Sequence, residues 1–306
     1  MLSTFSTFPR LIQFTMLNHK TNRRLFVKEM ALLSAAALVP SLVIAKGKGA
    51  KMKLGLVTYQ WGRDWDCSTL IKNCSAAKIF GVELRIEHAH GVEPSISANR
   101  RKEVKKMFAN SPVKIIGMGT NQQYDFIEPD KLKQSIEQTK AFIKLSADIG
   151  GSGVKVKPNA FHAEVPREKT IEQIGKALNE VGKFGADYGQ KIRLEVHGVE
   201  TQELPNIKAI MDVANHPNVY TCWNSNDEDL IGGGLEYNFN LVKDRQGDTV
   251  HIRELNVGQY PYQQLMDLFV KMDYKGWILL ECRTEPADRV KAMMEQLEIF
   301  NGMIRK

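Results

Sequence analysis

The chain has 306 residues, of which 43% are hydrophobic and 25% are charged, and its formal net charge at pH 7 is +7. Five Lys or Arg and one Glu lie in the first 45 residues, so the other 261 residues carry only +3 (37 minus 34). A weak positive balance without basic runs excludes the electrostatic footprint of a nucleic-acid-binding protein, and 261 residues suit one large domain.

Residues 1–45 have the features of an export signal and not of a folded segment. The pair Arg23-Arg24 precedes an apolar run of 16 residues from Met30 to Ala45, which Pro40 interrupts. This pattern resembles a twin-arginine signal peptide, and the run is short for a membrane span. We therefore predict a cleaved signal, a periplasmic or otherwise exported protein, and no stable membrane anchor. A retained amphiphilic tail is the alternative.

Short β-rich segments alternate with amphipathic helical segments from residue 52 onward, with a spacing of about 25 to 35 residues. Parallel strands joined by crossover helices have this order. The predicted strands lie near 53–58, 82–87, 113–118, 153–157, 192–197, 219–223, 249–253 and 277–282. The predicted helices lie near 67–80, 95–110, 129–149, 168–189, 203–215, 236–243, 261–273 and 286–303. Eight such repeats predict an α/β fold, a single-domain (β/α)8 TIM barrel over residues 46–306.

An open doubly wound sheet is the alternative fold, and the glycine pattern argues against it. No GxGxxG motif follows the first predicted strand, which runs instead into Thr58-Tyr59-Gln60-Trp61-Gly62. The triplet Gly232-Gly233-Gly234 lies in a late loop with no strand before it. It is therefore interpreted as a flexible loop and not as a phosphate-binding turn.

Five predicted strands carry charged side chains on a face that would otherwise be apolar. Alternate residues of a strand point to opposite faces, and one face holds only apolar residues such as Val82, Leu84 and Ile86. The other face holds Glu83/Arg85/Glu87, Lys155/Lys157, Arg193/Glu195/His197, His251/Arg253 and Glu281/Arg283. Ionic groups inside a parallel sheet covered by helices must be paired, metal-bound or at the mouth of a cavity. Their convergence predicts a reaction site at the C-terminal rim of the barrel.

Four residues that can bind a metal stand at the ends of the fifth to eighth predicted strands, namely Glu195, Asn224, His251 and Glu281. Three oxygen donors and one imidazole, without thiolates, suit a divalent ion such as Mn²⁺, Mg²⁺, Co²⁺ or Zn²⁺. A single Glu at a strand end is usually a salt-bridge partner, and a single His is usually structural. Four groups at equivalent positions favour a metal site, because converging charges would otherwise stay unpaired.

The segments around these residues resemble the metal-binding strand ends of the xylose isomerase-like TIM-barrel superfamily, which includes the sugar phosphate isomerase/epimerase family. They are Leu194-Glu195-Val196-His197-Gly198, Cys222-Trp223-Asn224-Ser225-Asn226-Asp227, Val250-His251-Ile252-Arg253 and Leu280-Glu281-Cys282. The resemblance implies ligand roles for Glu195, His251 and Glu281 on the fifth, seventh and eighth strands. The family usually has Asp at the position of Asn224 and His three residues later, at the position of Asp227. The amide oxygen of Asn224 can still coordinate an ion, with one negative charge fewer.

The chemistry that the resemblance implies is proton transfer next to a carbonyl group. A divalent ion would stabilise a metal-bound enediolate of a small carbohydrate substrate. Glu195 and Glu281, on opposite sides of the ion, are the predicted catalytic residues, because one could remove a proton and the other could return it. The leading hypothesis is therefore a sugar isomerase or epimerase, and an oligomer is compatible with the sequence.

Other side chains near these strand ends are predicted to contact the substrate. The predicted substrate-binding residues are Lys155, His197, Arg253, Arg283 and Trp61. The cations among them could bind hydroxyl or oxyanion oxygens, or they could pair with acidic neighbours such as Glu83. Trp61 could form an apolar wall for a sugar ring, although about half of such aromatic residues belong to an ordinary core.

Two other functions use the same residues. A lyase or hydratase acting on 3-keto-sugars or 3-keto-glycosides would also remove a proton beside a keto group and would then expel a neighbouring substituent. A non-catalytic sugar-binding protein would keep the site without turnover, and Asn224 is compatible with that. Endonucleases of the same superfamily need more His, Asp and Glu ligands and a basic groove, neither of which is visible.

Overall fold

The computed structural model describes residues 51–305. Eight strands form one sheet: β1 Lys53–Val57, β2 Gly81–Arg85, β3 Lys114–Gln123, β4 Gly153–Lys157, β6 Lys191–Glu195, β8 Val219–Asn224, β9 Gln246–Ile252 and β10 Trp277–Leu280. All neighbours are parallel, and the sheet closes in the order β1-β10-β9-β8-β6-β4-β3-β2. The predicted (β/α)8 TIM barrel is confirmed. The export signal predicted at residues 1–45 lies outside the described residues and stays a prediction.

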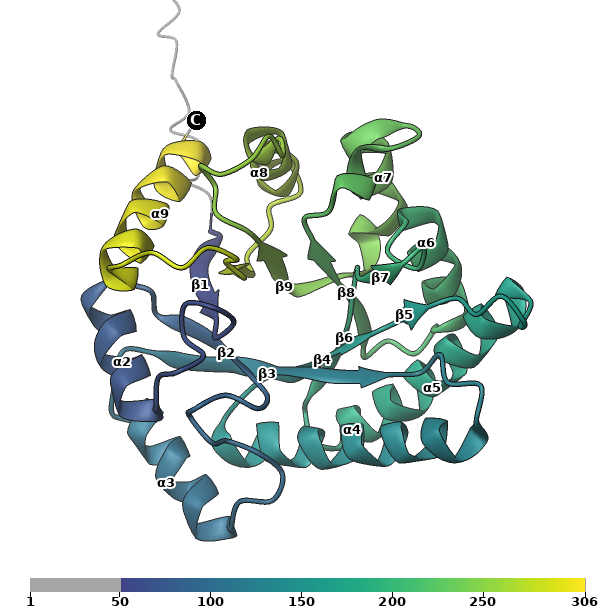
Figure 1. The fold of residues 1–306 in the computed structure, drawn as a ribbon, viewed down its shortest axis with the longest axis horizontal. Coiled ribbons are helices and arrows are strands. Elements are labelled where there is room, and N and C mark those ends of the chain that lie inside the picture. Colours follow the sequence, from purple (N-terminus) through teal and green to yellow (C-terminus); the bar gives the residue numbers. More distant parts are fainter. Residues whose placement is uncertain (1–50, 306) are drawn as a thin grey trace, which may run out of the picture. The chain divides into compact units, whose positions relative to one another are not determined.

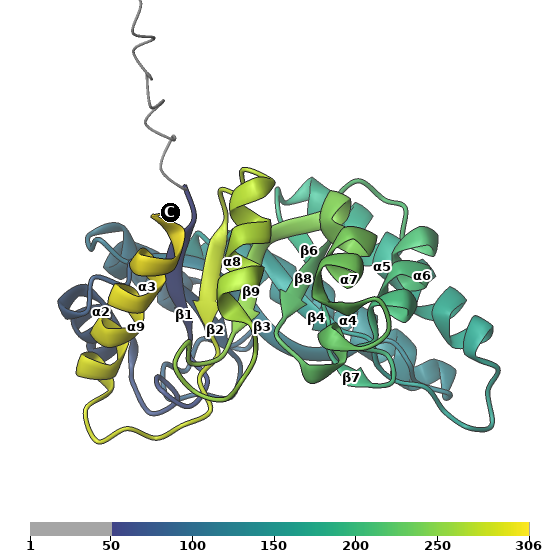
Figure 2. The ribbon, with the colours of Figure 1, turned by 90° about the horizontal axis from the view of Figure 1, so that it is seen from above.

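Helices surround the strands on the outside of the barrel (Figure 1). They are α2 Cys67–Ala76, α3 Ala98–Ala109, α4 Pro129–Ile149, α5 Arg167–Asp187, α6 Leu204–Val213, α7 Gly234–Val242, α8 Tyr262–Lys271 and α9 Arg289–Ile304. Figure 2 shows α2, α3 and α9 at one end of the molecule and α5 and α6 at the other. Each predicted helix is present, with ends that differ by a few residues.

Helix α4 shows why these segments form helices at these places. Pro129 occupies its first turn, where the missing backbone N–H costs no hydrogen bond, and Gly150 ends it with a left-handed φ of 87°. Ile136, Phe142 and Leu145 are buried on one face of the helix, which forms an apolar stripe. Local sequence signals and the apolar stripe therefore define the same helix.

Two features of the sheet were not predicted. Strand β3 continues to Gln123, beyond the predicted end at residue 118, and its pairing with β4 shifts register between Gly119 and Gln123. A separate two-stranded sheet joins β5 (Asn159–Ala160) to β7 (Gly198–Val199). Strands of two residues carry no period-two pattern, so sequence periodicity could not reveal them.

Charged side chains fill part of the barrel interior, and glycines make room for them. A Cβ atom on Gly117 would lie 2.6 Å from Nη1 of Arg193, and one on Gly119 would lie 2.7 Å from Oε1 of Glu83. Arg193 is fully buried, and its Nε donates to Asp248 Oδ1 at 2.8 Å. Side chains on β3 at these two positions would therefore displace the buried charges.

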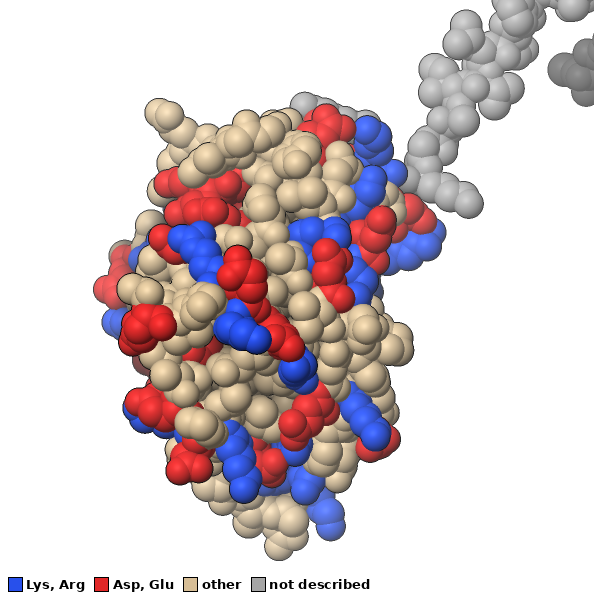
Figure 3. Space-filling view, turned by 90° about the vertical axis from the view of Figure 1, so that its right-hand side faces the viewer, with Lys and Arg blue, Asp and Glu red and all other residues tan. Residues whose placement is uncertain are grey.

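The outer surface over α5 and α6 carries charges of both signs. Figure 3 shows Lys and Arg interspersed with Asp and Glu on the face that it presents. Ion pairs along these helices include Lys176–Glu172 at 2.6 Å and Lys208–Asp212 at 2.6 Å. Such exposed pairs contribute little stability, but they leave neighbouring charges of opposite sign. Within residues 51–305, no helix is both long enough and apolar enough to cross a membrane.

Candidate functional site

The four predicted metal ligands lie together at one edge of the barrel. Glu195 and Asn224 are the last residues of β6 and β8, His251 is next to last in β9, and Glu281 follows β10 directly. Parallel strands end at the same edge of a barrel, which brings these side chains together. One ligand atom from each of Glu195, His251 and Glu281 lies within 4.8 Å of the others.

The distances within this group suit a shared divalent ion. Nδ1 of His251 is 2.9 Å from Oε1 of Glu195 and 3.9 Å from Oε1 of Glu281. Nδ2 of Asn224 donates to Oε1 of Glu195 at 3.2 Å. Donors bound to one ion at about 2.0–2.2 Å lie about 3–4 Å from one another, so the observed separations fit such a centre. Carboxylate and imidazole donors without thiolates match the ions expected from the sequence.

Glu83 on β2 lies behind His251 and was not assigned a role from the sequence. Its Oε1 is 3.0 Å from Nε2 of His251, and both side chains are fully buried. The angles of this contact are not those of a hydrogen bond, so it counts as an ion pair only. Neither carboxylate oxygen of Glu83 accepts a hydrogen bond from residues 51–305. A carboxylate beside the imidazole nitrogen that does not bind the metal holds the ring in position. Here Glu83 lies beside Nε2 of His251, which would leave Nδ1 for the ion. The sequence could have indicated this role of Glu83 only through its inward-facing position between Val82 and Leu84.

Lys155 on β4 contacts Glu195 from the side opposite His251. Its Nζ donates to Oε2 of Glu195 at 2.8 Å and to the carbonyl oxygen of Thr120 at 3.1 Å. The Lys155 side chain is only 4% exposed, so its ammonium group lies within the barrel and beside a catalytic candidate. Its role in binding the substrate directly stays a prediction.

The two catalytic candidates have opposite pKa shifts. Burial alone would raise the pKa of Glu195, but the charges of Lys155 and His251 hold it well below its usual value. Burial raises the pKa of Glu281, and the charge of Glu195 raises it further. A pair of carboxyl groups with diverging pKa values is the arrangement expected of a base and an acid.

The surroundings of His251 favour its protonated form in the absence of an ion. Burial disfavours its protonated form, but Cys222, Glu83 and Glu195 outweigh that effect and raise its pKa well above the usual value. Because an imidazole must be neutral to bind a metal, an ion and a proton would compete for Nδ1.

The predicted substrate-binding residues next along these strands face the barrel mouth. Half-buried His197 follows Glu195 by two residues, and its Nδ1 has no hydrogen-bond partner among the described residues. Burial lowers the pKa of His197. Nε of Arg253 donates to the carbonyl oxygen of Ser225 at 3.3 Å. The Arg283 side chain is exposed.

Trp61 lies in the loop after β1 and is only 2% exposed. Its Nε1 donates to the carbonyl oxygen of Thr284 at 2.9 Å, so the indole joins the loops that follow β1 and β10. Little of its surface faces solvent or a cavity. Contact between Trp61 and a substrate therefore stays a prediction.

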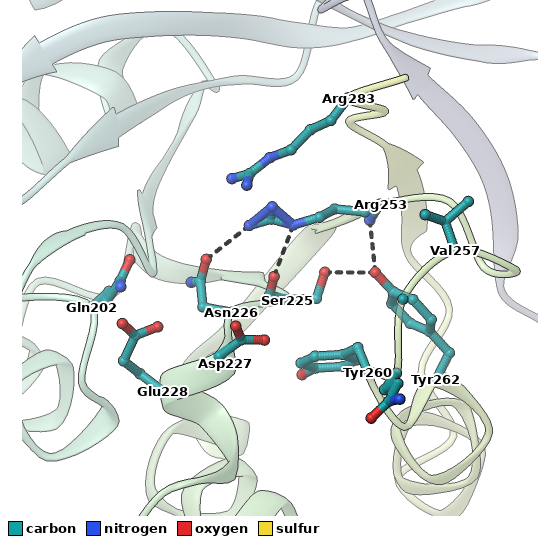
Figure 4. Close-up of a pocket in the computed structure, with 12 residues that line it drawn as sticks. Gln202, Ser225, Asn226, Asp227, Glu228, Arg253, Val257, Tyr260, Tyr262 and Arg283 are labelled. Atoms are coloured by element: carbon teal, nitrogen blue, oxygen red, sulfur yellow. Dashed lines mark hydrogen bonds between the residues drawn. The ribbon is translucent and has the colours of Figure 1, made fainter. Parts of the chain in front are cut away.

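A cavity of about 400 Å³ opens beside the metal-ligand candidates. Arg253 and Arg283 lie on one side of it, and Asp227 and Glu228 lie on another. In the view of Figure 4, Tyr260 and Tyr262 lie below Arg253 and to the right of the two acids. None of the four ligand candidates lines this cavity. It adjoins them because Arg253 and Arg283 are two residues beyond His251 and Glu281 on the same strands or their extensions.

Comparisons with known proteins agree with this architecture. A family model described as xylose isomerase-like TIM barrel matches residues 71–302. A 3-keto-D-glucoside 4-epimerase from E. coli has 14% identity and a TM-score of 0.70, with 82% of this chain and 100% of that chain covered. An L-ribulose 3-epimerase has 15% identity and a TM-score of 0.71, with 83% and 94% covered.

A third similar structure is that of IolI with a bound zinc atom, at 14% identity and a TM-score of 0.67, with 83% of this chain and 98% of that chain covered. No curated protein sequence matches the chain. At these identities the solved structures show a shared fold. They leave the reaction of this chain to be inferred from its own site.

Proposed function

The chain belongs to the xylose isomerase-like TIM barrel family, and from this premise we propose that it is a divalent-metal-dependent sugar isomerase or epimerase. The observation that carries the proposal is the close approach of Glu195, His251 and Glu281 beside a cavity at the C-terminal rim. The sugar epimerases among the similar structures support the same reaction class.

The proposed ion would be held by Glu195, His251 and Glu281, with the side-chain oxygen of Asn224 as a fourth donor. A bound divalent ion would polarise a substrate carbonyl and stabilise the negative charge that forms when a neighbouring C–H bond loses its proton. Glu83 would keep the His251 ring in position. The neutral amide of Asn224 weakens the electrostatic attraction for the ion, and so does the buried ammonium of Lys155, which also limits the repulsion between carboxylates when no ion is bound.

Glu195 and Glu281 would move the proton. Lys155 and His251 keep Glu195 ionised, so its carboxylate is available to accept a proton from substrate carbon, and the same two charges make it a weaker base. Glu281 would return a proton to the other face of the carbon. Without an ion its raised pKa favours the protonated form, whereas an ion bound to its carboxylate would oppose protonation, and its side chain is 18% exposed. Removal on one face of the carbon and return on the other would invert it, which is epimerisation.

A lyase or hydratase acting on a 3-keto-glycoside is the second candidate. The cavity lies next to the ligand candidates and is lined on one side by Tyr260 and Tyr262, which leaves room for a leaving group outside the reacting ring. One of the similar structures is a 3-keto-D-glucoside 4-epimerase, so keto-glycosides occur among the substrates of this fold. Both reactions begin with the same proton removal. Product analysis separates them, because epimerisation conserves mass whereas elimination releases an aglycone.

The test is incubation of the Mn²⁺-loaded protein in D₂O with a panel of keto-sugars and keto-glycosides, followed by NMR for deuterium at carbon. Wild-type protein should exchange solvent deuterium into at least one substrate. Glu195→Gln and Glu281→Gln should each lower the rate by roughly 100-fold or more, the usual scale of general acid or base groups. Glu168→Gln, at an exposed position in the first turn of α5, is the matched control and should keep the wild-type rate.

Near wild-type rates in both site variants would reject their catalytic roles. Removal of the ion with a chelator should abolish exchange, and added Mn²⁺ should restore it. Sugar binding with no exchange in any ionic form would favour a non-catalytic sugar-binding protein.

A further inference from the structure

Above the metal-ligand layer, the next inward side chain is basic on five of the strands, whereas Asn226, two residues beyond Asn224, is neutral. Each basic side chain lies two residues beyond a charged residue of that layer and so points to the same face of its strand or strand extension. These basic residues are Arg85, Lys157, His197, Arg253 and Arg283. The layer below is different, because its charges have opposite signs and contact one another, as Lys155 and Glu195 do at 2.8 Å.

The four Lys and Arg side chains of this basic layer have no carboxylate partner. None of them forms an ion pair within 4.0 Å among residues 51–305. Arg283 is exposed, but the other three are half-buried, and most other half-buried Lys and Arg side chains of that region do form ion pairs. Nη2 of Arg253 donates only to the neutral Asn226 Oδ1, at 3.2 Å. Arg85 lies over the Tyr59 ring at 5.2 Å and reaches a neutral amide oxygen at 3.4 Å.

Arg253 and Arg283 bring two of these charges to one wall of the cavity (Figure 4). The acidic groups across the cavity are Asp227 and Glu228, which also form no ion pair among the described residues. Among the residues that line the cavity, two arginines therefore face two acids, and Arg85 and Lys157 add positive charge outside that lining. A divalent ion on Glu195 and Glu281 would offset the charges of those carboxylates, so they would not act as counter-charges for the two arginines.

We propose that the substrate is an anionic sugar, whose carboxylate or phosphate group binds Arg253 and Arg283 away from the carbon that exchanges its proton. This inference rests on the proposed function, because it names the class of sugar that the same site would take. A guanidinium group has a planar set of donors that matches the oxygens of a carboxylate or a phosphate. A neutral sugar would supply hydroxyl groups only and would leave adjacent like charges without a counter-charge.

Calorimetric titration of the full chain loaded with Mn²⁺ tests the inference at constant ionic strength. The probes are D-glucose, D-glucuronate and D-glucose 6-phosphate, so the two anionic arms separate a carboxylate from a phosphate. At least one anionic probe should bind roughly tenfold or more tightly than D-glucose, the usual effect of a charge-assisted hydrogen bond. Arg283→Gln should remove most of this preference, and Arg283→Lys should keep part of it.

Arg305→Gln is the matched control, because it removes the same charge from an exposed residue at the end of α9. It should leave the preference unchanged. Equal binding of the three probes, or binding of none, would overturn the inference. So would an anionic preference that survives in Arg283→Gln, because the anion would then bind the metal ion and not the arginines.

Failure of this inference is separable from failure of the proposed function. Deuterium exchange into neutral keto-sugars without an anionic preference would reject the anionic substrate and leave the isomerase proposal standing. A preference for anionic probes that depends on Arg283, without deuterium exchange into any sugar, would support the anionic site and reject the isomerase proposal.

Discussion

Asp229 is a buried carboxyl group beneath the wall of the cavity. Its Oδ2 accepts hydrogen bonds from Tyr260, at 2.6 Å, and from the backbone N–H of Asn226, at 3.0 Å. Its other oxygen has no hydrogen-bond partner among residues 51–305. Burial raises the pKa of Asp229 to about 7, because it outweighs the two hydrogen bonds. Its charge state therefore changes close to neutral pH.

This raised pKa makes the stability of the folded chain depend on pH. A carboxyl group whose folded pKa exceeds its unfolded value of 3.8 contributes stability below pH 3.8 and loses that contribution as the pH rises to about 7. As the pH rises to about 7, the free energy of unfolding of wild type should fall by a few kcal/mol relative to that of Asp229→Asn. The slope should be at most about 1.4 kcal/mol per pH unit. Urea denaturation between pH 4 and pH 8 measures the difference.

Asp187→Asn, at an exposed position that ends α5, is the control and should run parallel to wild type. If the difference in the free energy of unfolding between wild type and Asp229→Asn is constant across the whole range, the pKa of Asp229 is not raised by folding.

At the scale of residues, the sequence predicted which side chains meet better than how they pair. The alternation along the strands placed Glu195, His251 and Glu281 at one rim, and they lie together there. It could not show that Lys155 donates to Glu195 or that Glu83 faces His251, because the stagger between strands decides which inward residues touch. Those pairings depend on contacts between strands that are distant in the sequence.

At the scale of elements, the small sheet of β5 and β7 joins two loops of the rim. The loop after β4 and the loop after β6 pair through Asn159 with Gly198 and Ala160 with Val199. Oγ1 of Thr201 donates to the carbonyl oxygen of Asn159 at 3.0 Å. Loops held in this way keep the residues that they carry in a fixed relation to the barrel mouth.

Gly198 is the residue on which this small sheet depends. Its φ is 102°, and a Cβ atom there would lie 1.8 Å from the backbone oxygen of Asn159. Gly198→Ala should therefore lower the free energy of unfolding by about 2 kcal/mol or more, because both strain and overlap oppose the side chain. Chemical denaturation measures this loss, and hydrogen exchange should show faster opening near Asn159.

Gly302→Ala is the matched control for this substitution. Gly302 lies in α9 with nothing within 4 Å of an added Cβ atom, so alanine should be neutral or stabilise by up to about 1 kcal/mol. Equal stability of Gly198→Ala and wild type would mean that the two loops separate at little cost.

The main elements could be predicted because each has its own signal in the sequence. Helix α4 has Pro129 at its start, Gly150 after its end and a buried stripe between them. The extension of β3 and the pair β5 and β7 lack such signals. They form only because neighbouring segments of the folded chain offer backbone partners, which is a tertiary effect.

At the scale of the whole molecule, we propose that the barrel is exported and that residues 1–45 are removed. The pair Arg23-Arg24 before an apolar run motivates this, and the remaining chain would begin at Lys46. N-terminal sequencing of exported protein should give Lys46, and replacing both arginines with lysine should retain the precursor in the cytoplasm. A mature N-terminus at Met1 or Met16 would contradict cleavage.

The buried charges of the barrel interior come from both halves of the chain. Glu83 and Lys155 belong to the first four barrel strands, whereas Glu195 and His251 belong to the last four. A half-barrel closed against a half that lacks the complementary charges would bury unpaired ions, at a cost of several kcal/mol per ion. Chimeras that combine either half with a relative would consequently need a donor whose interior supplies the complementary signs, so this chain is a poor candidate for recombination at the midpoint of its barrel.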